Sequence, residues 1–146
     1  MDDVIINKME TIKRCINRVN DVYNDNPRNL EDYTKQDSII LNIHRLCEAG
    51  IDIAMHLIAE LELGVPQTSR EAFTILNEEK IIDDSMTEKL KAMVGFRNIA
   101  VHDYQKLNLK IVQSIIENNL HDVKSFAEIM KEVKKKSETG ENEGGI

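Results

Sequence analysis

The chain of 146 residues has little of what breaks helices and little of what stacks on nucleic-acid bases: two Pro, six Gly, no Trp and 4% aromatic residues. So few aromatics argue against a platform for single-stranded bases. So few helix breakers leave long stretches free to be helical. No apolar run approaches the ~20 residues that a membrane span needs. The first three residues provide no basic segment ahead of an apolar one, so we expect no signal peptide. We also expect no membrane among the partners of the chain.

Cysteine is also scarce. Both cysteines, Cys15 and Cys47, lie inside apolar patterns of helical spacing. That placement suits reduced, buried thiols in a cytoplasmic protein and offers no disulfide framework.

Basic residues are outnumbered, with 19 Lys and Arg against 26 Asp and Glu and a net charge of −7. An acidic surface repels nucleic acid over most of its area, so a phosphate site must be a local basic island. Residues 86–110 form one such island, with a net charge of +3. Its basic residues are Lys89, Lys91, Arg97, Lys106 and Lys110. Charge runs of this size are more often solvated faces, so the island alone is weak support for anion binding.

Apolar residues recur at steps of three and four over four long segments, which is the spacing of an amphipathic helix. The segments are residues 5–23, 40–61, 86–94 and 109–133, and the second can begin as early as Asn29. Short connections make neighbouring helices antiparallel. The sequence therefore predicts an all-α, up-and-down four-helix bundle.

Two capping boxes predict further helix starts. Residues 68–71 (TSRE) open one short extra helix through Leu76, and residues 85–88 (SMTE) open the third long helix. We expect the helical bundle to occupy residues 1–133. Residues 134–146 lack apolar spacing and are predicted to be a flexible, disordered tail.

Three histidines share a helix face with a carboxylate four residues away: His44 with Glu48, His56 with Asp52, and His121 with Glu117. Such pairs can bind metal, but they are more often hydrogen-bonded surface pairs. Neither the repeated Glu-x-x-His of di-iron bundles nor His-Glu-x-x-His occurs. We therefore expect no metal site and no cofactor.

The fourth histidine has a different setting. Arg97, Asn98, His102 and Tyr104 crowd into eight residues flanked by apolar positions. Asn98 and His102 share a helix face, and Arg97 and Tyr104 align on an adjoining face if the helix persists. Arg97 continues an inward-facing stripe, so its guanidinium needs a partner charge, an anion or water. Two interpretations stay open: an anion site, or a structural arginine clamped by Glu or carbonyls with His102 capping the helix.

The string from Arg97 to Tyr104 (RNIAVHDY) resembles the signature of the HEPN superfamily, which is Arg, a polar residue, three more residues and then His. With Tyr two positions after His, it is most similar to the HepT toxin branch. The resemblance extends over nearly the whole chain in length, helix order and the short extra helix. It implies a metal-independent endoribonuclease, in which the RNA 2′-hydroxyl attacks the adjacent phosphate and leaves a 2′,3′-cyclic phosphate.

The resemblance also implies roles for the motif. Arg97 would hold the phosphate, and His102 would be the general acid or base. Asn98 would orient the scissile group or His102. Tyr104 would be the residue that a cognate nucleotidyltransferase antitoxin modifies with AMP, which blocks the toxin.

RNA transesterification needs one group to take a proton and another to give one. One His102 per chain supplies one such group, and a two-fold dimer supplies both. We therefore expect a homodimer, or an oligomer of such dimers, with RNA in a cleft that both motifs line.

Two other functions stay open. The chain could be a non-catalytic module that binds a nucleotidyltransferase, because its acidic charge suits protein partners better than RNA. Alternatively, Arg97, His102 and Tyr104 could hold a nucleotide without cutting RNA.

Overall fold

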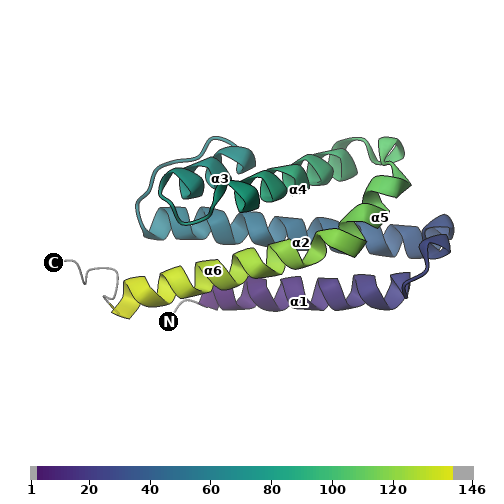
Figure 1. The fold of residues 1–146 in the computed structure, drawn as a ribbon, viewed down its shortest axis with the longest axis horizontal. Helices are drawn as coiled ribbons and strands as arrows, with labels where there is room; N and C mark the ends of the chain where they lie inside the picture. The colour runs from purple at the N-terminus through teal and green to yellow at the C-terminus, as the bar shows by residue number, and fades with distance from the viewer. Residues whose placement is uncertain (1–2, 140–146) are drawn as a thin grey trace.

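In the computed structural model, residues 3–139 are described, and over that range the fold is an all-α bundle without strands, as predicted. Its elements are α1 (Asp3–Tyr23), η1 (Pro27–Glu31), α2 (Tyr33–Glu60), α3 (Ser69–Glu78), α4 (Asp84–His102), η2 (Tyr104–Lys106), α5 (Leu109–Asn118) and α6 (Leu120–Thr139). The long helices run lengthwise beside one another, and α3 covers one end of α2 (Figure 1). Within the described range, none of the helices has the length and apolar content that crossing a membrane requires.

The central helix of the bundle is α2, which packs against α1, α3, α4 and α6. Gly50 lies where α2 and α6 approach closely, because a Cβ there would come within 3.1 Å of Val123 Cγ1. The rings of Phe73 from α3 and Phe126 from α6 meet edge to face, with centroids 5.4 Å apart. Both rings are almost completely buried. The apolar stripes of the sequence thus meet in one core.

The last predicted long helix is two helices. Residues 109–133 keep an unbroken apolar spacing, but the chain bends at Asn119 between α5 and α6 (Figure 1). The Asn119 side chain donates to Asp122 Oδ2 at 3.0 Å, and the Asp122 amide donates to the Asn119 carbonyl at 3.1 Å. These bonds satisfy polar groups at the break, so the bend costs little. Because the spacing of the apolar residues continues across the bend, the sequence pattern does not indicate it.

Two predicted helix starts are also corrected. The segment after Asn29 belongs to the 3₁₀ helix η1, and Asp32 caps the start of α2 by accepting from the Lys35 amide at 3.0 Å. The capping box at 85–88 is wrong, because Asp83 caps α4 by accepting from the Met86 amide at 2.8 Å.

The predicted cap at residues 68–71 is confirmed, since Thr68 Oγ1 accepts from the Glu71 amide at 3.1 Å.

The predicted start of the C-terminal tail, residue 134, is wrong. Helix α6 continues to Thr139, and Lys134 Nζ reaches Glu60 Oε2 on α2 at 3.1 Å. The remaining predicted tail, residues 140–146, lies outside the described residues.

Truncating Phe126 to alanine tests the core. The ring is fully buried, so we expect Phe126→Ala to lower the free energy of unfolding by ~3–5 kcal/mol, measured by urea titration. The control is Leu41→Ala, at a position 46% exposed on α2, which should change stability by less than about 0.5 kcal/mol. Equal effects of the two substitutions would contradict the packing described.

Candidate active site

The guanidinium of Arg97 joins three helices. From its position on α4, Nη1 pairs with Glu48 Oε1 on α2, and Nη2 donates to Ser69 Oγ on α3 at 3.1 Å. Nε donates to Asn98 Oδ1 at 2.9 Å. The Arg97 side chain is 18% exposed, so it lies at the edge of the core. Within the described part of the chain, these contacts leave a second N–H on each terminal nitrogen for a ligand.

The carboxylate of Glu48 lies between Arg97 and a histidine, because His44 Nε2 is 3.7 Å from the same Oε1 that pairs with Arg97. Glu48 is 38% exposed. An ion pair so close to water adds little net stability.

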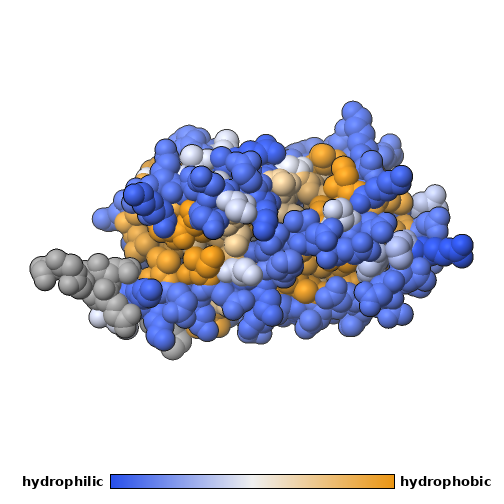
Figure 2. Space-filling view, viewed as in Figure 1, coloured by the Kyte–Doolittle hydropathy of each residue, from blue (hydrophilic) through white to orange (hydrophobic). Residues whose placement is uncertain are grey.

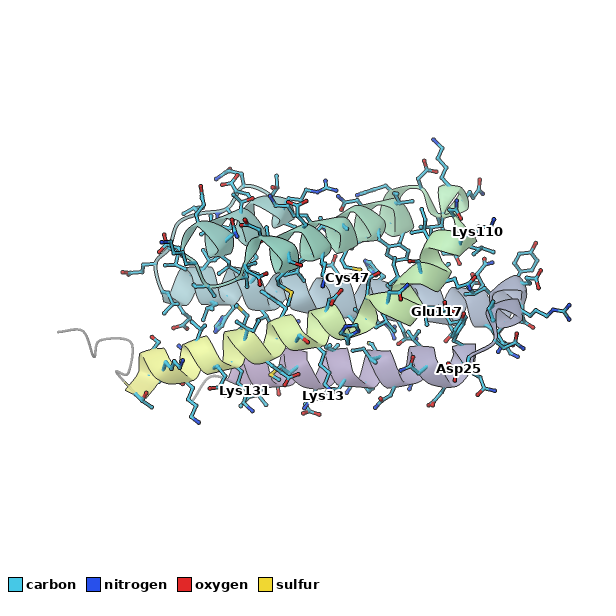
Figure 3. All side chains as sticks on the ribbon, viewed as in Figure 1. Lys13, Asp25, Cys47, Lys110, Glu117 and Lys131 are labelled. Carbon is cyan, nitrogen blue, oxygen red and sulfur yellow. The ribbon has the colours of Figure 1, made fainter. Side chains whose placement is uncertain are left out.

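The thiol of Cys47 on α2 is buried inside the bundle (Figure 3). Burial raises the pKa of Cys47 to about 12, against the opposing effect of the Arg97 charge. Both Cys15 and Cys47 are free and buried, as expected. At neutral pH the Cys47 thiol is protonated and takes no part in the site.

The motif continues past the end of α4. His102 is the last residue of that helix, its side chain is exposed, and Asp103 follows as the C-cap. Helix α4 therefore stops before Tyr104, and the predicted alignment of Tyr104 with Arg97 along one helix is wrong. Asn98 contacts Arg97 through Oδ1, a contact the sequence did not indicate.

Tyr104 begins η2 and faces α2. Its phenol donates a hydrogen bond to Asp37 Oδ1 near the start of α2, and its side chain is 39% exposed. Partial burial, then the hydrogen bond and charge of Asp37, raise the pKa of Tyr104 to about 12. The phenol is thus both accessible and firmly protonated at neutral pH.

Each of the other histidines lies near a carboxylate. His44 lies 3.7 Å from Glu48, as the spacing predicts. His56 lies 3.7 Å from Glu60, and His121 lies 3.5 Å from the buried carboxylate of Asp122. Within residues 3–139, no group of three or more His, Cys, Asp or Glu side chains is arranged to hold a metal ion.

A largely apolar groove of about 770 Å³ lies between α4 and α5. Its lining includes Ile99 from the motif and Ile111 from α5, and Figure 2 shows apolar surface where these helices meet. Arg70, Lys89, Lys106 and Lys110 add positive charge to the groove, and Figure 3 places Lys110 at the start of α5.

Part of the predicted basic island is neutralised by ion pairs. Lys89 pairs with Asp122 at 3.8 Å, and Arg97 pairs with Glu48; both carboxylates come from outside residues 86–110. The island therefore has a weaker field than its sequence charge indicates.

The sequence analysis does not identify three residues of the site, which are Glu48, Ser69 and Asp37. Glu48 was considered with His44 and Ser69 as part of a capping box, but neither was connected to Arg97. Asp37 carried no signal at all. Each makes its contact across 28 to 67 positions of sequence, so the pairs follow from helix packing.

An all-α bundle that holds an arginine, a histidine and a tyrosine around the end of one long helix defines a chain of the HEPN type. The profile of the family described as ribonuclease HepT-like matches residues 12–130. This chain belongs to that family, which confirms the resemblance of the motif.

Relatives are similar over most of their length. The chain is 50% identical over 131 residues to the mRNA nuclease HepT of Shewanella oneidensis, covering 90% of this chain and 98% of the relative. It is 28% identical over 109 residues to the tRNA nuclease HepT of Aphanizomenon flos-aquae, covering 72% of each. Among solved structures, a tri-AMPylated HEPN toxin of S. oneidensis in complex with MNT antitoxin is 50% identical, with a TM-score of 0.85. That match covers 90% of this chain and 98% of the toxin.

Proposed function

We propose that this chain is a metal-independent endoribonuclease, the toxin of a toxin–antitoxin pair, and that it cuts RNA in the cytoplasm. The observation that carries the proposal is the Arg97 guanidinium, held from three helices close to the exposed end of α4 that bears His102. A 50% identical relative that is an mRNA nuclease supports it.

Arg97 is suited to the phosphate. Its contacts to Glu48 and Ser69 fix the plane of the guanidinium, while its outer N–H groups can grip two phosphate oxygens. Charge develops on these oxygens as the 2′-hydroxyl attacks. A donor already in place lowers the energy of that charge without reorganising.

His102 provides the proton transfer. An imidazole can take or give a proton near neutral pH. The His102 side chain is exposed at the end of α4, where RNA can reach it. The same reaction needs both a base and an acid, and a second copy of the chain supplies the second imidazole.

Replacing Arg97 or His102 tests the catalytic roles. We expect Arg97→Ala and His102→Ala each to lower the rate of RNA cleavage by at least ~10²-fold and to abolish toxicity, with helicity unchanged by circular dichroism. Arg14→Ala on α1 and His121→Ala on α6 are matched controls that should cleave normally. The assays contain a chelator, because no metal is invoked.

Loss of cleavage on chelation would overturn the metal-independent reaction. Full activity of Arg97→Ala would show that Arg97 is a structural residue only, which its contact with Glu48 also fits. Absence of cleavage by the unsubstituted chain would favour the competing non-catalytic module.

We place the homodimer contact at the end of α4. Ile99 and Val101 lie between the polar residues Asn98 and His102 of the motif, yet they are 43% and 51% exposed. Exposed apolar side chains beside an apolar groove mark a surface that another molecule covers. A two-fold contact there brings both His102 side chains toward one axis.

An acidic substitution tests this contact. We expect Ile99→Asp to convert the dimer to a monomer in sedimentation velocity and to lose cleavage, because a buried, unpaired carboxylate opposes association. The control is Val65→Asp, which is 79% exposed in the loop after α2 and should leave both unchanged. A fully active Ile99→Asp monomer would exclude a composite site.

We also propose that a partner nucleotidyltransferase silences the toxin by transferring AMP to Tyr104. The phenol is 39% exposed and lies two positions after His102. A phosphodiester attached there would bring negative charge to the RNA site and repel the substrate.

Removing the phenolic oxygen tests this regulation. Tyr104→Phe should cleave RNA at the wild-type rate but accept no AMP from the MNT antitoxin of S. oneidensis, as measured by mass spectrometry. Tyr33→Phe, which removes a phenol that is 79% exposed on α2, should still be modified. Continued modification of Tyr104→Phe would place the target elsewhere.

A further inference from the structure

Tyr104 is held by a carboxylate that has no role in the proposed cleavage of RNA. Asp37 lies near the start of α2, 67 positions from Tyr104 in sequence, and its Oδ1 accepts the phenolic hydrogen bond. Asp37 is itself exposed. The pair therefore lies at the surface, where a second protein carrying a nucleotide can approach the phenol.

Transfer of AMP to a tyrosine requires the phenol to lose its proton. With a pKa of about 12 for Tyr104, roughly one phenol in 10⁵ is ionised at pH 7. A nucleophile so rarely ionised needs a base within hydrogen-bond reach of its oxygen. Among the described residues, Asp37 is the carboxylate that makes this contact.

We propose that Asp37 is the general base for AMP transfer to Tyr104, so that the toxin supplies the base for its own inactivation. As Tyr104 Oη forms a bond to the α-phosphorus of ATP, the bond from that phosphorus to the bridging oxygen breaks and pyrophosphate leaves. The phenolic proton passes to Asp37 Oδ1 and then to water. This inference rests on the proposed modification of Tyr104.

The geometry of the pair suits a transfer of the proton to Asp37 during the reaction. The neighbouring ionic groups of η2 and its cap, Lys106 and Asp103, pair with each other at 3.1 Å. The Tyr104 phenol already points its hydrogen at Asp37, so no rearrangement precedes the transfer. The contact also fixes the phenolic oxygen in space, which aligns it for attack.

The base role is separated from a positioning role by two substitutions. Asp37→Asn keeps an oxygen that accepts the hydrogen bond but cannot take the proton, whereas Asp37→Ala removes both. Single-turnover AMP transfer is measured with the full chain, ATP and the MNT antitoxin of S. oneidensis. Asp21→Asn on α1, also exposed, is the matched control.

We expect Asp37→Asn to slow transfer by ~10²-fold at pH 7, as much as Asp37→Ala, and Asp21→Asn to behave as wild type. The deficit of Asp37→Asn should shrink as pH rises, because phenolate then forms without a base. The substitution should also lower the pKa of Tyr104 in an ultraviolet titration, since Asp37 helps to raise that pKa.

The outcomes distinguish the two proposals. If Asp37→Asn transfers AMP normally while Tyr104→Phe does not, the role of Asp37 as base is overturned and the modification of Tyr104 stands. A rate lost in Asp37→Ala and retained in Asp37→Asn likewise overturns the base in favour of positioning. If wild type accepts no AMP, or Tyr104→Phe accepts as much as wild type, the proposed regulation itself fails.

Discussion

The contact between Arg97 and Glu48 is the constraint on which the candidate site depends. A guanidinium at the edge of an apolar core is costly unless its N–H groups are satisfied. Here α2 supplies a carboxylate, α3 a hydroxyl and α4 the Asn98 amide. These partners offset the cost of placing the guanidinium there. They also fix the orientation of the N–H groups that the proposed chemistry needs. The structural interpretation of Arg97 and the catalytic one are therefore compatible.

The sequence predicts the helices well because they are long and strongly periodic. The apolar stripes of α1 and α2 indicate the buried faces directly, and Thr68 marks the start of α3. Boundaries are less readable. Asp83 caps α4 two positions before the predicted Ser85, and the bend at Asn119 leaves the apolar period intact. Local hydrogen bonds decide both, and periodicity does not report them.

The residues of the candidate site also fall into two groups, those that the sequence indicates and those that it does not. Arg97, Asn98, His102 and Tyr104 form a local string, so a motif finds them. Glu48, Ser69 and Asp37 lie on other helices, and their contacts depend on how those helices pack. The end of α4 at His102 also matters, because Tyr104 then lies in η2, where its phenol reaches Asp37 near the start of α2. A motif read as one continuous helix gives the wrong neighbour for Tyr104.

Helices α2 and α4 explain why two chemistries can share one end of the bundle. They run in opposite directions, so residues early in α2 lie beside the chain after α4, and residues midway along α2 lie beside Arg97 (Figure 1). Glu48 and Asp37 are eleven positions apart, close to three turns of one helix, and so face the same side of it. One register of two helices thus presents one carboxylate to the guanidinium and another to the phenol. Because the carboxylates are distinct, substitutions at Asp37 test the proposed control of the toxin separately from the proposed cleavage of RNA.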